Sequence, residues 1–166
     1  MKTLLLGDSL TAWHDWHDLL GEHLNHGVPG DTTEGLLRRL PRSLSSRPER
    51  VILAIGTNDL LQQTPPESVK EHYLDILNEL LDVEQLIVLS VPPVADAPLV
   101  NERIIALNHW LMEQTWKYHF HFVDLYRALS GGGNALKQEY TTDGVHLSEA
   151  GYAAWETVLK AGLEEA

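Results

Sequence analysis

The chain contains no cysteine, few basic side chains and no long apolar segment. Without cysteine it can form neither disulfides, nor a thiolate nucleophile, nor a thiolate metal site. No stretch approaches the roughly 20 apolar residues that a membrane-spanning helix requires. The first apolar run, Thr3 to Leu6, is shorter than the core of a signal peptide, which has about 7 to 15 residues. We therefore expect a cytoplasmic protein.

Basic residues are scarce, because 12 lysines and arginines stand against 24 aspartates and glutamates, giving a formal net charge of -12. The acidic residues are spread along the chain rather than gathered in a tail. Such a charge repels polyanions, so we expect neither a nucleic-acid partner nor stable association with an anionic membrane. No feature of the sequence indicates an oligomeric state.

The length of 166 residues and the apolar content of 43% fit one compact domain spanning residues 1–166. Apolar runs predict buried strands at Thr3 to Leu6, Val51 to Ile55, Leu86 to Val91 and His119 to Val123, with a shorter candidate at Glu22 to His26. The segments between them show helical periodicity, as at Val69, Tyr73, Ile76 and Leu80. This alternation predicts a three-layer α/β/α domain with a parallel sheet covered by helices on both faces.

Several residues mark helix boundaries. Asp31, followed three residues later by Glu34, fits a capping box, and Ser148 precedes the last helical segment. Pro41 leaves open whether residues 32–46 form one kinked helix or two short ones. Strand alternation places His119 and His121 on the same side of their strand.

Chemically functional residues follow the predicted strands. Ligands bind outside the carboxyl ends of the strands in an open parallel sheet, and five candidate residues fall in the connections at that edge: Ser9, Gly30, Asn58, Asp143 and His146. We therefore expect these sequence-distant residues to meet at one site.

The five residue types suit acyl transfer through a serine. A histidine, whose pKa is ordinarily about 6.5, accepts the serine proton, and an acidic residue orients it. His146 is the candidate base, and Asp143, three residues earlier, is close enough to reach its Nδ1 atom. The backbone N–H groups of Ser9 and Gly30 and the side-chain amide of Asn58 are candidate donors to the oxyanion.

Four segments carry a family resemblance: Gly7-Asp8-Ser9-Leu10, Gly30 with the residues around it, Gly56-Thr57-Asn58-Asp59, and Asp143-Gly144-Val145-His146-Leu147. In this order they resemble the four sequence blocks of the GDSL or SGNH hydrolases. The resemblance implies a flavodoxin-like five-stranded parallel sheet, Ser9 as nucleophile, and Asp143 and His146 completing the triad. It also implies an oxyanion hole completed by Gly30 and Asn58, and hydrolysis of esters or thioesters without a metal or other cofactor.

The expected partner is a small-molecule ester, such as a short-chain ester, an O-acetylated sugar or a lysophospholipid. The alternative is a non-catalytic module that binds a carbohydrate or acyl ligand on the same fold.

Other residues near the predicted site have simpler interpretations. Asp8 and Asp59 are expected to bind backbone groups. Trp13 and Trp16 either line a substrate pocket or anchor the first helix. Four histidines cluster near the N-terminus, but they match no known ligand spacing, so we expect no bound metal. They are His14, His17, His23 and His26.

Overall fold

A single parallel sheet forms the centre of the computed structural model, which describes residues 1–166. Its five strands lie in the order β2-β1-β3-β4-β5, the flavodoxin-like order. The strands are β1 (Thr3–Gly7), β2 (His23–Gly27), β3 (Arg50–Ala54), β4 (Gln85–Leu89) and β5 (His121–Val123). The predicted α/β class and five-stranded parallel sheet are confirmed.

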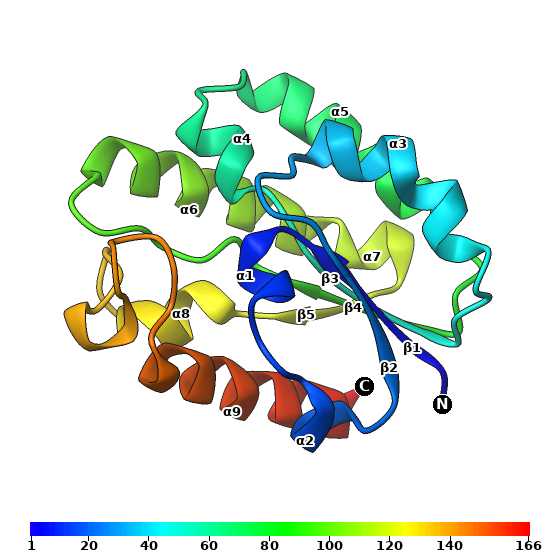
Figure 1. Ribbon diagram of the computed structural model, residues 1–166. Coiled ribbons are helices and arrows are strands. Elements are labelled where there is room, and N and C mark those ends of the chain that lie inside the picture. Colours follow the sequence, from blue (N-terminus) through cyan, green and yellow to red (C-terminus); the bar gives the residue numbers. More distant parts are fainter.

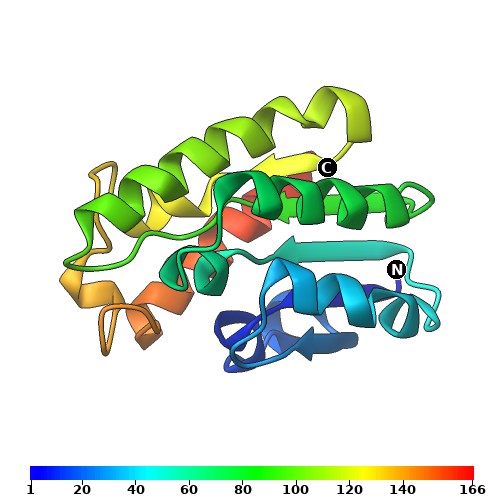
Figure 2. The same cartoon turned by 90° about the horizontal axis from the view of Figure 1, so that it is seen from above.

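Helices cover both faces of this sheet (Figures 1 and 2). The helices packed on one face are α3 (Thr33–Leu44), α4 (Thr57–Leu61), α5 (Pro66–Glu79), α6 (Pro98–Glu113) and α7 (Thr115–Tyr118). Those associated with the other face are α1 (Ser9–Ala12), α8 (Leu125–Ser130) and α9 (Glu149–Glu165), with the short α2 (His17–Leu20) beside them. A 3₁₀ turn, η1 (Gln138–Tyr140), precedes the loop that leads into α9. No helix is both long and apolar enough to cross a membrane.

The central strand β1 explains why a continuous apolar run forms a strand here. Leu4 and Leu6 belong to the core beneath α3 to α6, whereas Leu5 belongs to the core beneath α8 and α9. All three leucines are buried because both faces of the sheet are covered. Each face therefore has its own apolar core, and β1 contributes to both.

Two local predictions are wrong. The fifth strand begins at His121, because His119 adopts the left-handed conformation (φ 52°) that ends α7. His119 and His121 therefore do not share a strand face. The N-cap of α3 is Thr32, which accepts a hydrogen bond from Gly35 N, rather than Asp31. The Asp31 carboxylate instead pairs with Arg39 Nε at 2.7 Å.

Other boundaries agree with the sequence. Ser148 caps α9 by accepting a hydrogen bond from Gly151 N at 3.2 Å. Residues 33–44 form one helix with Pro41 inside it.

Gly151 provides a test of how α9 packs against the preceding loop. A Cβ atom there would collide with the Tyr140 carbonyl oxygen and lie 3.1 Å from Leu147 Cβ. Glycine to alanine in an open helix normally stabilises a protein by about 0.5–1 kcal/mol. We expect Gly151→Ala to lower the free energy of unfolding by about 1–3 kcal/mol instead, because the site is overpacked.

Chemical denaturation of Gly151→Ala tests this, with Ala153→Gly at an exposed position of the same helix as the control. The free energy of unfolding of the control should fall only by the difference in helix propensity between alanine and glycine, about 0.5–1 kcal/mol. A Gly151→Ala protein more stable than the wild type would contradict the packing argument.

Candidate active site

Ser9 stands at the carboxyl end of β1, where the chain turns into α1. Asp8 is the N-cap of α1, and its Oδ1 atom accepts a hydrogen bond from Leu10 N at 2.9 Å. Gly7 allows the close approach of β3, since a Cβ atom there would lie 2.8 Å from the Ala54 carbonyl oxygen. Ser9 is consequently held in the first turn of a helix, with its backbone N–H among those that lack an intrahelical acceptor.

The structure brings Ser9, His146 and Asp143 into one hydrogen-bonded chain. Ser9 Oγ lies 3.1 Å from His146 Nε2, and His146 Nδ1 lies 2.6 Å from Asp143 Oδ2. The other carboxylate oxygen of Asp143 accepts hydrogen bonds from His146 N at 2.7 Å and Val145 N at 2.9 Å. These hydrogen bonds, first of all that from the His146 side chain, lower the pKa of Asp143 to about 2. Asp143 is therefore ionised at neutral pH.

The loop that carries His146 is itself fixed by backbone contacts. Thr142 N and Thr141 Oγ1 both donate to the His146 carbonyl oxygen, at 3.0 and 2.7 Å. The Gly144 carbonyl oxygen accepts a hydrogen bond from Ala95 N at 2.8 Å, which joins this loop to the segment after β4. The position of the imidazole is thus fixed both by the hydrogen bonds of its ring and by those of the backbone of its loop.

Gly30 and Asn58 lie in the loops that follow β2 and β3. Gly30 has φ +79°, which favours glycine, and the space beside its Cα is open. Its N–H group has no acceptor within the protein. Asn58 Nδ2 donates one hydrogen bond to the Asp31 carbonyl oxygen at 2.8 Å, which leaves the second amide hydrogen available.

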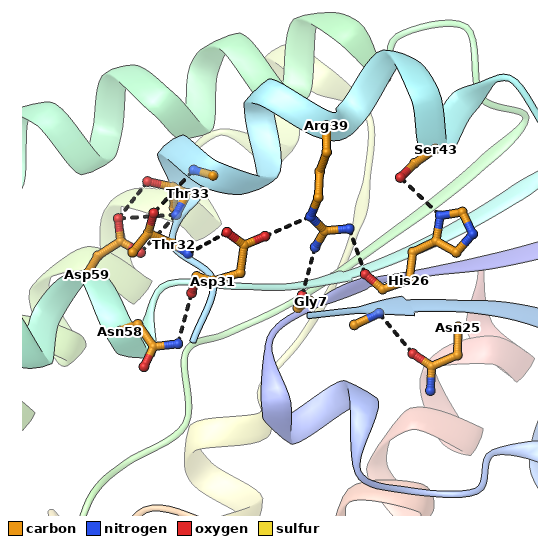
Figure 3. A network of polar contacts seen from close by, with 12 residues as sticks. Gly7, Asn25, His26, Asp31, Thr32, Thr33, Arg39, Ser43, Asn58 and Asp59 are labelled. Carbon is orange, nitrogen blue, oxygen red and sulfur yellow. Dashed lines mark hydrogen bonds and ion pairs between the residues drawn. The ribbon is translucent and has the colours of Figure 1, made fainter. Parts of the chain in front are cut away.

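These two loops are also tied together through Asp59 (Figure 3). The Asp59 carboxylate accepts hydrogen bonds from Thr33 N at 3.0 Å and Thr33 Oγ1 at 2.7 Å. Burial raises the pKa of Asp59, and the bonds from Thr33 oppose that rise. The prediction that Asp8 and Asp59 bind backbone groups is confirmed for both.

The two tryptophans after Ser9 have different surroundings. Trp16 is 1% exposed and donates a hydrogen bond to the Thr11 carbonyl oxygen at 2.9 Å. Trp13 is 57% exposed, and its ring centroid lies 4.6 Å from that of His146. Trp16 is therefore a core anchor, whereas Trp13 is an exposed aromatic surface beside the site.

The clustered histidines bind different partners. His14 Nε2 lies 2.9 Å from Glu156 Oε1, and the His14 ring stacks on Tyr152 at 4.3 Å. His26 Nδ1 lies 3.0 Å from Ser43 Oγ, and His23 Nδ1 lies 2.8 Å from the Gly21 carbonyl oxygen. No three or more potential ligands among the His, Asp and Glu residues converge on a common point.

One surface hollow lies away from this site. It measures about 940 Å³ and is lined in part by Thr3 and His23, which begin β1 and β2. It therefore lies at the amino ends of the strands, whereas Ser9 lies at the carboxyl end of β1.

The sequence reasoning missed Arg39, whose guanidinium binds the loop between β2 and α3 (Figure 3). A signal was present, because Arg39 follows the buried Leu36 by three residues and so shares its helix face. A charged residue on the buried face of a helix indicates a specific partner.

A protein family and a solved structure are similar to this chain. The model of the GDSL-like Lipase/Acylhydrolase family matches residues 5–154. A solved structure described as a platelet activating factor from Streptococcus pneumonia is 30% identical in sequence and superimposes with a TM-score of 0.87. The match covers 97% of this chain and 83% of that one.

Two curated relatives are longer. The N-acylneuraminate cytidylyltransferase of Streptococcus agalactiae serotype V is 27% identical over 150 residues, 88% of this chain and 35% of that protein. An arylesterase of Vibrio mimicus is 31% identical over 112 residues, 55% of this chain and 56% of that protein. The chain thus spans about a third of the length of the first relative.

Asp8 provides a pH test of the site. The residue is 3% exposed, and burial raises the pKa of its carboxyl from 3.8 to about 6. Between these values the unfolded chain loses the proton while the folded chain keeps it, so stability falls as the pH rises. Asp8→Asn removes this titration. We expect the wild type to lose on the order of 2 kcal/mol of unfolding free energy relative to Asp8→Asn between about pH 4 and pH 6.5.

Denaturant titrations at several pH values measure this difference, and any constant effect of the asparagine cancels. Asp18→Asn, at an exposed position of the chain, is the matched control substitution. A constant difference between the wild type and Asp8→Asn over this range would contradict the expectation.

Proposed function

Because this chain belongs to the GDSL-like lipase and acylhydrolase family, we propose that it hydrolyses carboxylic esters with Ser9 as the nucleophile. The observation that carries the proposal is the chain of contacts from Ser9 Oγ to His146 Nε2 at 3.1 Å and from His146 Nδ1 to Asp143 at 2.6 Å. This is the order of groups that serine acyl transfer requires.

In the proposed reaction, Ser9 Oγ attacks the carbonyl carbon of the ester while its proton passes to His146 Nε2. The imidazolium then gives this proton to the leaving alcohol, and the acyl group remains on Ser9. A water molecule, deprotonated by His146, attacks the acyl-enzyme and releases the carboxylic acid and free Ser9. Asp143 holds the imidazole with Nδ1–H directed at its carboxylate, so that Nε2 accepts the proton from Ser9.

We assign the oxyanion hole to Ser9 N–H, Gly30 N–H and Asn58 Nδ2. The free N–H of Gly30 and the second amide hydrogen of Asn58 support this assignment. Such donors act mainly on the tetrahedral intermediate, in which the carbonyl oxygen becomes negative.

The proposed substrates are small acyl esters, including short-chain esters, O-acetylated sugars and lysophospholipids, with thioesters as a further class. The exposed indole of Trp13 beside His146 offers a flat surface for one part of such a substrate. The name of the Vibrio mimicus relative, an arylesterase, is consistent with this class.

The first test is hydrolysis of p-nitrophenyl acetate and butyrate. We expect Ser9→Ala to lower kcat by at least about 10³-fold, because the nucleophile is lost. Ser45→Ala, at an exposed position of the chain, is the control and should match the wild type. A fluorophosphonate should label the wild type once, at Ser9. Equal hydrolysis by the wild type and Ser9→Ala would refute the proposal, and a folded protein that binds ligands but resists the probe would indicate the non-catalytic module.

A second test concerns Asn58. We expect Asn58→Ala to lower kcat by about 10²- to 10³-fold, with KM changed only a few-fold, because its amide acts mainly in the transition state. Asn134→Ala, at an exposed loop position, provides the control. A rise in KM with an unchanged kcat would instead assign Asn58 to ground-state substrate binding.

A further inference from the structure

Arg39 of α3 uses each nitrogen of its guanidinium on a different acceptor (Figure 3). Nε donates to Asp31 Oδ2 at 2.7 Å, Nη1 donates to the His26 carbonyl oxygen at 2.7 Å, and Nη2 donates to the Gly7 carbonyl oxygen at 2.9 Å. The side chain is 22% exposed and that of Asp31 is 11% exposed. This ion pair is thus more shielded from solvent than an ordinary surface pair.

The acceptors of Arg39 lie in the segments that position the three oxyanion donors. Gly7 lies two residues before Ser9, at the end of β1. His26 lies near the end of β2, and Asp31 directly follows Gly30. The Asp31 carbonyl oxygen in turn accepts the hydrogen bond from Asn58 Nδ2 at 2.8 Å.

Besides the hydrogen bonds between Thr33 and Asp59, two backbone hydrogen bonds restrain the Gly30 loop. Asp31 N donates to the Val28 carbonyl oxygen at 3.1 Å, and Val28 N donates to the Gly7 carbonyl oxygen at 3.1 Å. Gly30 has a positive φ of 79°, which glycine adopts without strain, so this residue does not by itself fix the direction of its N–H group. The Asp31 side chain, which supports its own turn by accepting Thr32 N at 3.0 Å, is fixed from outside the loop by Arg39.

We propose that Arg39 is a positioning residue. It holds the Gly30 N–H and the Asn58 side-chain amide in the positions, relative to Ser9, from which they can donate to the oxyanion. The inference rests on the proposed esterase function. Lysine cannot replace arginine in this role, because one ammonium on a flexible stem lacks the rigid planar fork that serves three acceptors at once. Loss of the fork should therefore weaken stabilisation of the transition state more than binding of the substrate.

The test compares Arg39→Lys with the wild type in hydrolysis of p-nitrophenyl acetate. We expect kcat to fall about 10- to 100-fold, somewhat less than the loss of a whole oxyanion donor, while KM changes less than about threefold. The inhibition constant of phenylboronic acid, which forms a tetrahedral adduct on serine, should rise by a similar factor. Arg38→Lys is the matched control, because the neighbouring Arg38 is exposed and pairs only with Glu34.

A double-mutant cycle distinguishes positioning from a general structural role. If Arg39 acts through the oxyanion donors, the fold decrease in kcat caused by Arg39→Lys should be at least about threefold smaller in an Asn58→Ala background than in the wild type. Additive effects would overturn the inference, as would a folded Arg39→Lys protein with a kcat within about threefold of the wild type. Should Arg39→Lys fail to fold, kcat, KM and the double-mutant cycle are measured with Asp31→Asn instead, since this substitution removes the charge that Arg39 Nε binds.

The outcomes also separate this inference from the proposed function. If Ser9→Ala retains full activity, the proposed function fails, whatever Arg39 does. If Ser9→Ala is inactive but neither Arg39→Lys nor Asp31→Asn lowers kcat, only the positioning role is rejected.

Discussion

The parallel pairing of β1 with β2 and β3 is the constraint on which the rest of the site depends. Gly7 is aligned with Gly27 on one side and with Ala54 on the other. The three strands therefore end at the same level, and the loops carrying Ser9, Gly30 and Asn58 begin side by side. The side chains of β1 and β3 are close-packed in the two cores, so a shift of this register would disrupt the packing on both faces of the sheet.

Much of the fold could be predicted because the buried strands are short apolar runs and the intervening helices have clear periodicity. The errors arose where two local choices were both acceptable. Asp31 and Thr32 can each cap a helix, and the pairing of Asp31 with Arg39, a contact outside the capping motif, leaves the cap to Thr32. The five predicted site residues follow strands or precede a helix, so topology placed them on one edge. The place of Arg39 on the helix face of Leu36 indicated a specific partner but not which one, because two of its acceptors are backbone carbonyls, which any sequence provides.

Four aspartates support the turns and loops at this edge of the sheet. Asp8, Asp31, Asp59 and Asp143 each accept a hydrogen bond from a backbone N–H in the turn or loop they support. In Asp8 the interior position makes ionisation costly, whereas in Asp143 the hydrogen bonds favour the ionised form. Aspartate thus stabilises a turn or loop at each of these positions, and its exposure and hydrogen-bond partners determine how readily it ionises.

Ser9 and His146 are in contact although 137 residues separate them in the sequence. During synthesis the serine leaves the ribosome first, and at about 5–20 residues per second the histidine is added roughly 7 to 27 seconds later. A nascent chain can pair β1 with β2 in this interval, yet it holds a serine without a base. All five strands precede His146 in the chain. In the proposed mechanism Ser9 therefore lacks its base until the whole sheet has been made, and the order of the chain delays hydrolysis until folding is almost complete.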